Sequence, residues 1–161
     1  MGDEGVFEGA RTTFTFFNAY RGGIAKALGE EKALALENGI FTAMGEMQGR
    51  TLKEQAGDTE FDLKSTTEVV KGFVSNLGIP FEVIEEGPST VRFKCGQCSV
   101  YEGSLGAGFD EKTRETMCNS GPLKFMDAMV RQLNPNLSYQ LTKFRSAPDD
   151  FCEEAIILSK S

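Results

Sequence analysis

Residues 69–98, VVKGFVSNLGIPFEVIEEGPSTVRFKCGQC, hold the sharpest change of pattern in this chain of 161 residues. Apolar residues first recur at helical spacing and stop at Leu77-Gly78, which is typical of a helix that ends at a glycine cap. Two segments rich in strand-forming residues, 80–85 and 90–94, follow on either side of a Glu-Gly-Pro-Ser turn. The sequence therefore predicts a helix, then a β-hairpin, and a Cys-x-x-Cys motif directly after the second strand.

The part of the chain before this stretch has helical patterns. Residues 6–27 and 30–56 carry apolar side chains at the spacing of helices, although Gly22-Gly23 is expected to break or bend the first one. Asp62 or Ser65 is expected to cap a third helix that runs to about residue 76. Three helices are therefore expected before the first strand.

Three glycines interrupt the second predicted helix, at Gly39, Gly45 and Gly49. Each costs about 1 kcal/mol relative to alanine inside a helix. Such glycines usually mark the close approach of another helix, which in a small domain is often a dimer seam, whereas a ligand-facing groove is the less common case. We therefore expect a homodimer that forms through residues 30–56.

The remainder of the chain mixes helix and strand. Glu102–Phe109 is glycine-rich and is expected to form a loop, and a helix is expected over 110–133, kinked or divided at Gly121-Pro122. Segments 137–144 and 151–158 resemble a closing hairpin. We predict an α+β fold, in which N-terminal helices pack on a small antiparallel sheet in the order ααα-ββ-α-ββ. The chain is expected to be one domain, 1–161, with a helical part, 6–57, and an α+β part, 62–158.

The composition excludes several classes of function. The chain has no histidine, so Ser-His and Cys-His nucleophile pairs and a histidine-ligated haem are excluded. A net charge of −7 argues against binding to nucleic acid, and no apolar run is long enough to span a membrane. A cytoplasmic location is the default expectation. The thirteen phenylalanines predict a well-filled core or, less commonly, a lined cavity for a small-molecule ligand.

The four cysteines are the main candidate site, and in the cytoplasm we expect them to be reduced. Cys95 and Cys98 have the spacing at which two thiolates share one metal or form a redox dithiol, and the redox alternative is weaker because the pair does not open a helix in a thioredoxin-like unit. Cys118 and Cys152 are single residues. The four either converge on one metal, with zinc suspected and an iron–sulfur cluster less favoured, or the latter two are small buried hydrophobes.

Three acidic residues lie near the cysteines in sequence. Glu102 follows the Cys-x-x-Cys motif by a few residues, and Asp150 and Glu153 flank Cys152. A carboxylate next to a thiol can act as a metal ligand or as a general base.

Three features of residues 30–158 carry a family resemblance. They are the helix and hairpin of 69–94, a cysteine after that hairpin with Cys118 about twenty residues further on, and a closing hairpin whose turn leads into Cys152 and an acid. With these features the chain resembles the ligand-binding superfamily shared by 4-vinyl reductase domains, L-2-amino-thiazoline-4-carboxylic acid hydrolase-like proteins and subunits of the eukaryotic transport particle. The cysteine trio looks closest to the hydrolase branch.

The resemblance implies several properties of the site. Phenol-sensing relatives hold zinc with three cysteines and a glutamate. Cys118 and Cys152 match two of those ligands, but Leu141 and Phe144 stand at the other two positions and cannot bind a metal. The same zinc site is therefore excluded, and a rearranged site would use Cys95 and Cys98.

Three functions follow as expectations. The first is a sensor-like domain that binds a small molecule or a metal, with Cys95, Cys98, Cys118 and Cys152 as zinc ligands. The second is a hydrolase of a thiazoline ring or a related C–N bond, in which Cys98 or Cys118 is the nucleophile or holds a metal, and Glu102, Asp150 or Glu153 is the base. The third is a dimeric protein-interaction module, as the likeness to transport-particle subunits implies.

Overall fold

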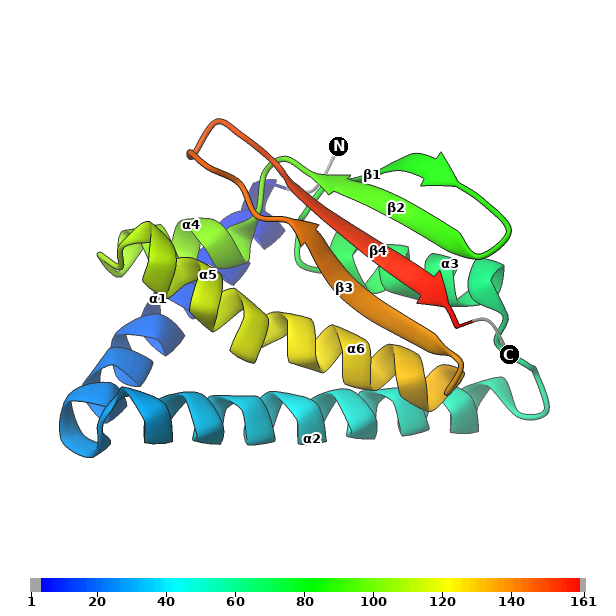
Figure 1. The fold of residues 1–161 in the computed structure, drawn as a ribbon, viewed down its shortest axis with the longest axis horizontal. Helices are drawn as coiled ribbons and strands as arrows, with labels where there is room; N and C mark the ends of the chain where they lie inside the picture. Colours follow the sequence, from blue (N-terminus) through cyan, green and yellow to red (C-terminus); the bar gives the residue numbers. More distant parts are fainter. Residues whose placement is uncertain (1–3, 160–161) are drawn as a thin grey trace.

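The computed structural model describes residues 4–159 and shows an α+β fold, as predicted (Figure 1). Its elements are α1 (Glu4–Leu28), α2 (Glu30–Ala56), α3 (Leu63–Ser75), β1 (Phe81–Glu86), β2 (Thr90–Cys95), α4 (Ser99–Gly106), α5 (Glu111–Ser120), α6 (Pro122–Leu133), β3 (Leu137–Lys143) and β4 (Cys152–Leu158). The order ααα-ββ-ααα-ββ differs from the expected one only between the two hairpins.

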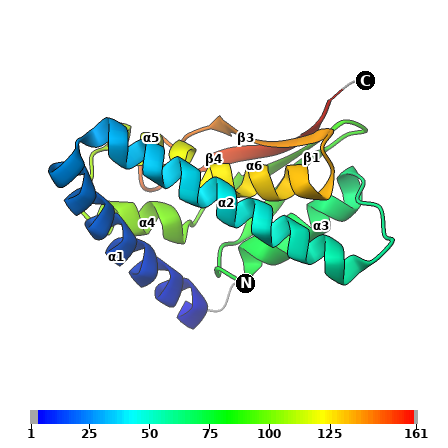
Figure 2. The same ribbon diagram turned by 90° about the horizontal axis from the view of Figure 1, so that it is seen from below.

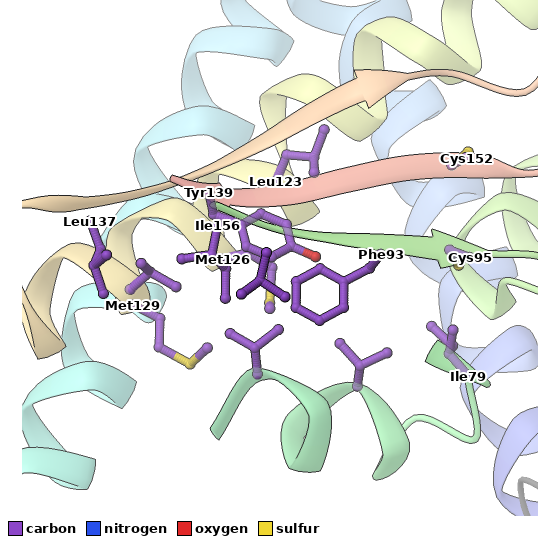
Figure 3. Packing of buried hydrophobic residues seen from close by; sticks show 14 residues of the cluster. Ile79, Phe93, Cys95, Leu123, Met126, Met129, Leu137, Tyr139, Cys152 and Ile156 are labelled. Atoms are coloured by element: carbon purple, nitrogen blue, oxygen red, sulfur yellow. The ribbon is translucent and has the colours of Figure 1, made fainter. Parts of the chain in front are cut away.

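The four strands form one antiparallel sheet in the order β1-β2-β4-β3, with helices on one of its faces (Figure 1). Alternation along β2 turns Val91, Phe93 and Cys95 toward the helices, and all three are buried. Their partners across the ladder are Ile156, Glu154 and Cys152 of β4. Because directly paired residues share a face, β4 presents a carboxyl and a thiol to the interior. Figure 3 shows part of this packed inner face.

Helix α2 packs along α6, which lies between α2 and the sheet (Figures 1 and 2). A Cβ added at Gly45 would lie 2.3 Å from the carbonyl oxygen of Phe125, and one at Gly49 would lie 2.5 Å from Cβ of Gln132. Two of the three glycines expected to mark a dimer seam therefore serve the contact between two helices of the same chain. They give no support to the expected dimer.

The prediction of a loop over Glu102–Phe109 is wrong for residues 102–106, because Ser99–Gly106 forms the helix α4. A Cβ added at Gly103 would lie 2.6 Å from Cβ of Phe14, so the glycine allows α4 to lie directly against α1. The glycine-rich composition thus reflects close helix packing rather than a flexible connection.

Of the two expected helix breaks at glycine, one is present and the other is absent. Gly121-Pro122 divides the predicted helix into α5 and α6, with Pro122 at the start of α6, as expected. Gly22-Gly23 does not break α1, which continues through both residues to Leu28.

A buried ion pair joins α1 to α2. The guanidinium of Arg21 lies 3.3 Å from the Glu37 carboxylate, both side chains being 3% exposed, and Arg21 Nη1 donates to Glu30 Oε2 at 2.9 Å. Gly121 leaves room for the same carboxylate, since a Cβ there would lie 2.7 Å from Glu37 Oε1. This contact joins the two long helices near the point where they diverge (Figure 2).

Within residues 4–159, no helix has the length and apolar character needed to cross a membrane.

Candidate functional site

A cavity of about 360 Å³ lies between the sheet and helices α1, α2, α3 and α6. Its wall is almost entirely apolar, and phenylalanines supply much of it: Phe14, Phe17, Phe41, Phe73, Phe81 and Phe125. The phenylalanine-rich composition therefore provides a lined cavity, which was the less common of the two expectations. A volume of this size lies within the range of small-molecule sites.

The cavity reaches the surface beside α2. Ile40 and Met44 both line it, and they are 54% and 47% exposed. On the opposite side, Phe14 and Phe17 of α1 line the same cavity. The exposed part of the cavity wall therefore includes apolar side chains of α2, which an apolar molecule can contact on entry.

One carboxyl, that of Glu154, lines this apolar cavity, and Tyr139 of the neighbouring strand lies with it. The Tyr139 hydroxyl donates a hydrogen bond to Glu154 Oε2. Burial raises the pKa of the Glu154 carboxyl and raises that of the Tyr139 hydroxyl well above its ordinary value. The low-polarity surroundings therefore favour the uncharged form of both groups.

Cys95, Cys98 and Cys118 line the same cavity as Glu154. We call these four residues the thiol end of the cavity. Cys98 and Cys118 are half-buried, and both line the cavity. Cys152 lines an adjoining hollow of about 30 Å³ that it shares with Cys98, Cys118 and Glu154. The structure thus brings the four predicted cysteines into one region, and all four are free thiols.

Arg145, which follows β3, crosses behind the thiols. Its side chain is buried, Nε donates to Cys152 Sγ at 3.4 Å, and Nη2 donates to the carbonyl oxygen of Cys95 at 3.0 Å. The guanidinium also stacks on Tyr101, 4.4 Å from the ring centroid. Arg145 therefore links the end of β3 to β2 and β4 through contacts next to the thiol end.

The thiols differ in their electrostatic surroundings. Burial raises the pKa values of Cys118 and Cys152. Interaction with the neighbouring Cys95 thiol lowers the pKa of Cys98, and the same interaction together with burial raises that of Cys95. The Cys95 thiol itself donates to the carbonyl oxygen of Gln97 at 3.7 Å. Cys98 is also the N-cap residue of α4, where the helix dipole favours a negative sulfur, and its side chain makes no capping hydrogen bond there. Cys98 is therefore the thiol best placed to ionise.

The three acids that sequence reasoning selected lie elsewhere. Glu102 is in α4, Asp150 pairs with Lys143 at 2.9 Å, and Glu153 is on the outer face of β4, 3.9 Å from Arg92. None of the three is among the described residues that line the cavity or the adjoining hollow. The carboxyl that does lie beside the thiols is Glu154.

Sequence reasoning missed Glu154, Tyr139 and Arg145. The first two left a signal in the strand period, because Glu154 alternates with Cys152 and Ile156, which are inward-facing residues, whereas Glu153 does not. The sequence gives no such signal for Arg145, because its hydrogen-bond partner, the carbonyl oxygen of Cys95, is 50 residues away in the chain.

In the described part of the chain, no group of three or more histidine, cysteine, aspartate or glutamate residues is arranged to hold a metal ion. The thiols share a region without converging on one point.

No model of a known protein family matches this chain. A search of curated proteins likewise finds no significant match. The fold class and the cavity therefore carry the functional argument.

Proposed function

We propose that this protein is a binding domain for a small, uncharged, largely apolar molecule that carries one polar group. The observation that supports this most is the cavity of about 360 Å³, whose wall is apolar apart from Thr13, Tyr139, Glu154 and the thiols. An apolar ligand gains about 25 cal/mol for each Å² of its surface removed from water. The polar group would hydrogen-bond to Glu154, which orients the ligand.

The charge of the cavity supports an uncharged ligand. The Glu154 carboxyl has a raised pKa because it is buried, and it already accepts a hydrogen bond from Tyr139. An anionic ligand would meet a carboxyl and several sulfur atoms. The nearby cations are already engaged, since Arg145 donates to Cys152 and Cys95, and Arg114, which lines the adjoining hollow, donates to the carbonyl oxygen of Phe109. A hydroxyl, an aromatic amine or an amide is a neutral polar group that fits this end.

Fluorescence titration with N-phenyl-1-naphthylamine tests the proposal, because this apolar dye has a single N–H donor and emits strongly only when removed from water. Ile40→Trp enlarges a side chain at the cavity mouth, and Leu36→Trp does so one turn away, at a similarly exposed residue that does not line the cavity. We expect saturable binding by the wild type, about tenfold weaker binding by Ile40→Trp, and unchanged binding by Leu36→Trp. Equal binding by both variants, or none by the wild type, would contradict the proposal.

We propose zinc binding as a second function, supported by the placement of four free thiols in one region. Thiolate sulfur is a preferred ligand of zinc, and modest side-chain rotations would have to bring Cys95, Cys98, Cys118 and Cys152 to one point. Elemental mass spectrometry combined with a thiol count tests it. About one zinc per chain, with thiols that react only after chelation, would support it. Metal-free protein that takes up no added zinc would exclude it.

We further propose that two copies associate through α2, in a cytoplasmic setting that keeps the thiols reduced. The support is a row of exposed apolar side chains on this helix, Leu36, Ile40, Met44 and Met47, each 47–58% exposed. Their spacing places them on one side of α2, and the row runs past the cavity mouth. A second copy seated there would cover both the row and the opening.

A further inference from the structure

The thiol end has a composition that ligand binding alone does not require. Cys98 faces an apolar cavity, Cys95 lies next to it, and the Glu154 carboxyl lines the same wall. An orienting hydrogen bond needs only Glu154 and Tyr139. Two adjacent thiols at the inner end of a cavity that opens to solvent are instead suited to a two-electron oxidation.

We propose that the thiol end reduces organic hydroperoxides that have an apolar body, with Cys98 as the attacking thiol and Cys95 as the thiol that completes a disulfide. The proposal rests on the proposed function in one respect, since the cavity must admit an apolar molecule.

The position of Cys98 in the fold favours it as the attacking thiol. It is the N-cap residue of α4, where the helix dipole stabilises a thiolate. Cys118 also lines the cavity but lies in the last turn of α5, at the end where the dipole disfavours a negative charge. Cys152 is buried, lies in the adjoining hollow and accepts a hydrogen bond from Arg145.

The reaction balances with one hydroperoxide and two thiols. The Cys98 thiolate attacks the terminal oxygen, so that an S–O bond forms as the O–O bond breaks. The departing alkoxide recovers the proton that Cys98 gave up, with the Glu154 carboxyl on the same wall available to pass it, and leaves as an alcohol. The Cys95 thiol then attacks the sulfenic sulfur, an S–S bond forms, and the hydroxyl leaves as water with the Cys95 proton. Two thiols lose two hydrogens, and the hydroperoxide becomes an alcohol and water.

The cavity wall selects the class of oxidant. Hydrogen peroxide gains nothing from an apolar wall, whereas an aryl or alkyl hydroperoxide buries its hydrocarbon part against Phe14, Phe17 and Phe73 and places its O–O group toward the thiols. Preference for the organic hydroperoxide is therefore part of the proposal.

The test uses metal-free, reduced protein and one equivalent of cumene hydroperoxide, followed by intact mass, peptide mapping and quantification of cumyl alcohol. We expect loss of two hydrogens per chain, a Cys95–Cys98 disulfide, one alcohol per disulfide, and a rate about tenfold or more above that with hydrogen peroxide. Cys98→Ser should abolish alcohol formation. Cys95→Ser should stop at a sulfenic acid that dimedone traps.

Several results would overturn the proposal. They are a disulfide mapped to other cysteines, wild-type rates in Cys98→Ser, or no preference over hydrogen peroxide. Circular dichroism and dye binding on each variant distinguish loss of the reaction from loss of the fold. Because dye binding does not need the thiols, retained binding without hydroperoxide reduction would overturn this inference and leave the proposed function standing.

Discussion

At the scale of single residues, a reciprocal pair of hydrogen bonds closes the start of α3: Ser65 N donates to Asp62 Oδ1 at 2.7 Å, and Asp62 N donates to Ser65 Oγ at 2.9 Å. The sequence predicted a cap at Asp62 or Ser65, and the structure uses both. Glu154 was not predicted because its role depends on which face of β4 turns inward. The alternation of Glu154 with Cys152 and Ile156 indicates that face only if those two residues are taken to point inward, and sequence reasoning selected Glu153 instead.

The cap at Asp62 gives a pH-dependent prediction. The hydrogen bond from the backbone N–H of Ser65 lowers the pKa of the Asp62 carboxyl below its usual value. A group whose pKa is lower in the folded chain stabilises the fold above its unfolded pKa of about 3.9, and this stabilisation is lost as the pH falls through the folded pKa. We expect Asp62→Ala to lower the Tm at pH 7 and to approach the wild type as the pH drops below about 4.

Thermal melts of Asp62→Ala and the wild type between pH 7 and about pH 3 measure the difference in Tm. Asp58→Ala is the matched control, since Asp58 is exposed, precedes the same helix, and its side chain makes no hydrogen bond or ion pair with the described residues. A pH-independent difference between Asp62→Ala and the wild type would show that the ionised cap is not the cause.

At the scale of elements, the hairpins were predicted because turn residues and alternation are local, and the helix α4 was missed because its stability is tertiary. Gly103 and Gly106 disfavour a helix by propensity, yet they face α1, where only a glycine fits the close approach at Gly103. Close helix packing also explains Gly45 and Gly49 of α2, which were expected in a dimer seam and instead contact α6. Glycine content indicated close packing correctly, but the identity of the partner was not in the local sequence.

Gly45 and Gly39 form a matched pair in α2. A Cβ at Gly45 would lie 2.3 Å from the Phe125 carbonyl oxygen, whereas a Cβ at Gly39 would meet nothing within 4 Å. We expect Gly45→Ala to destabilise the fold by about 1–3 kcal/mol, because α6 must shift, and Gly39→Ala to stabilise it by about 0.5–1 kcal/mol through helix propensity. Urea unfolding at one pH compares the two. Equal effects of both substitutions would place the α2–α6 contact elsewhere.

The ion pair between α1 and α2 gives a second element-scale prediction. Arg21→Met leaves the Glu37 carboxylate buried without its partner, and removal of one member of a buried pair costs about 3–5 kcal/mol. Because replacing both charges removes the uncompensated group, the double variant Arg21→Met/Glu37→Met should be more stable than Arg21→Met alone. Denaturant midpoints of the two variants test this order, and a double variant less stable than Arg21→Met would contradict it.

At the scale of the whole molecule, the cavity is the feature for which the sequence has the least predictive value. Its wall joins Phe14 and Phe17 of α1 to Glu154 of β4, residues that lie near opposite ends of the chain. The composition indicated that the phenylalanines would lie in a core or line a cavity, and the four cysteines indicated a metal or thiol site. Only the packing of α1, α2 and the sheet determines that the phenylalanines leave a space and that three thiols face it.

Association through α2 is the prediction that belongs to this scale. Met47, 58% exposed, extends the apolar row on α2 without lining the cavity, and Leu105, 41% exposed, is an apolar residue on a different helix. We expect wild-type protein to sediment at twice the chain mass of 17.6 kDa. Met47→Glu places a charge in the proposed seam, where its desolvation opposes association, so this variant should sediment at one chain mass. Leu105→Glu should leave the dimer intact. A wild type that remains monomeric at high concentration, or a dimer equally sensitive to both substitutions, would remove α2 as the seam and leave the cavity mouth open to solvent.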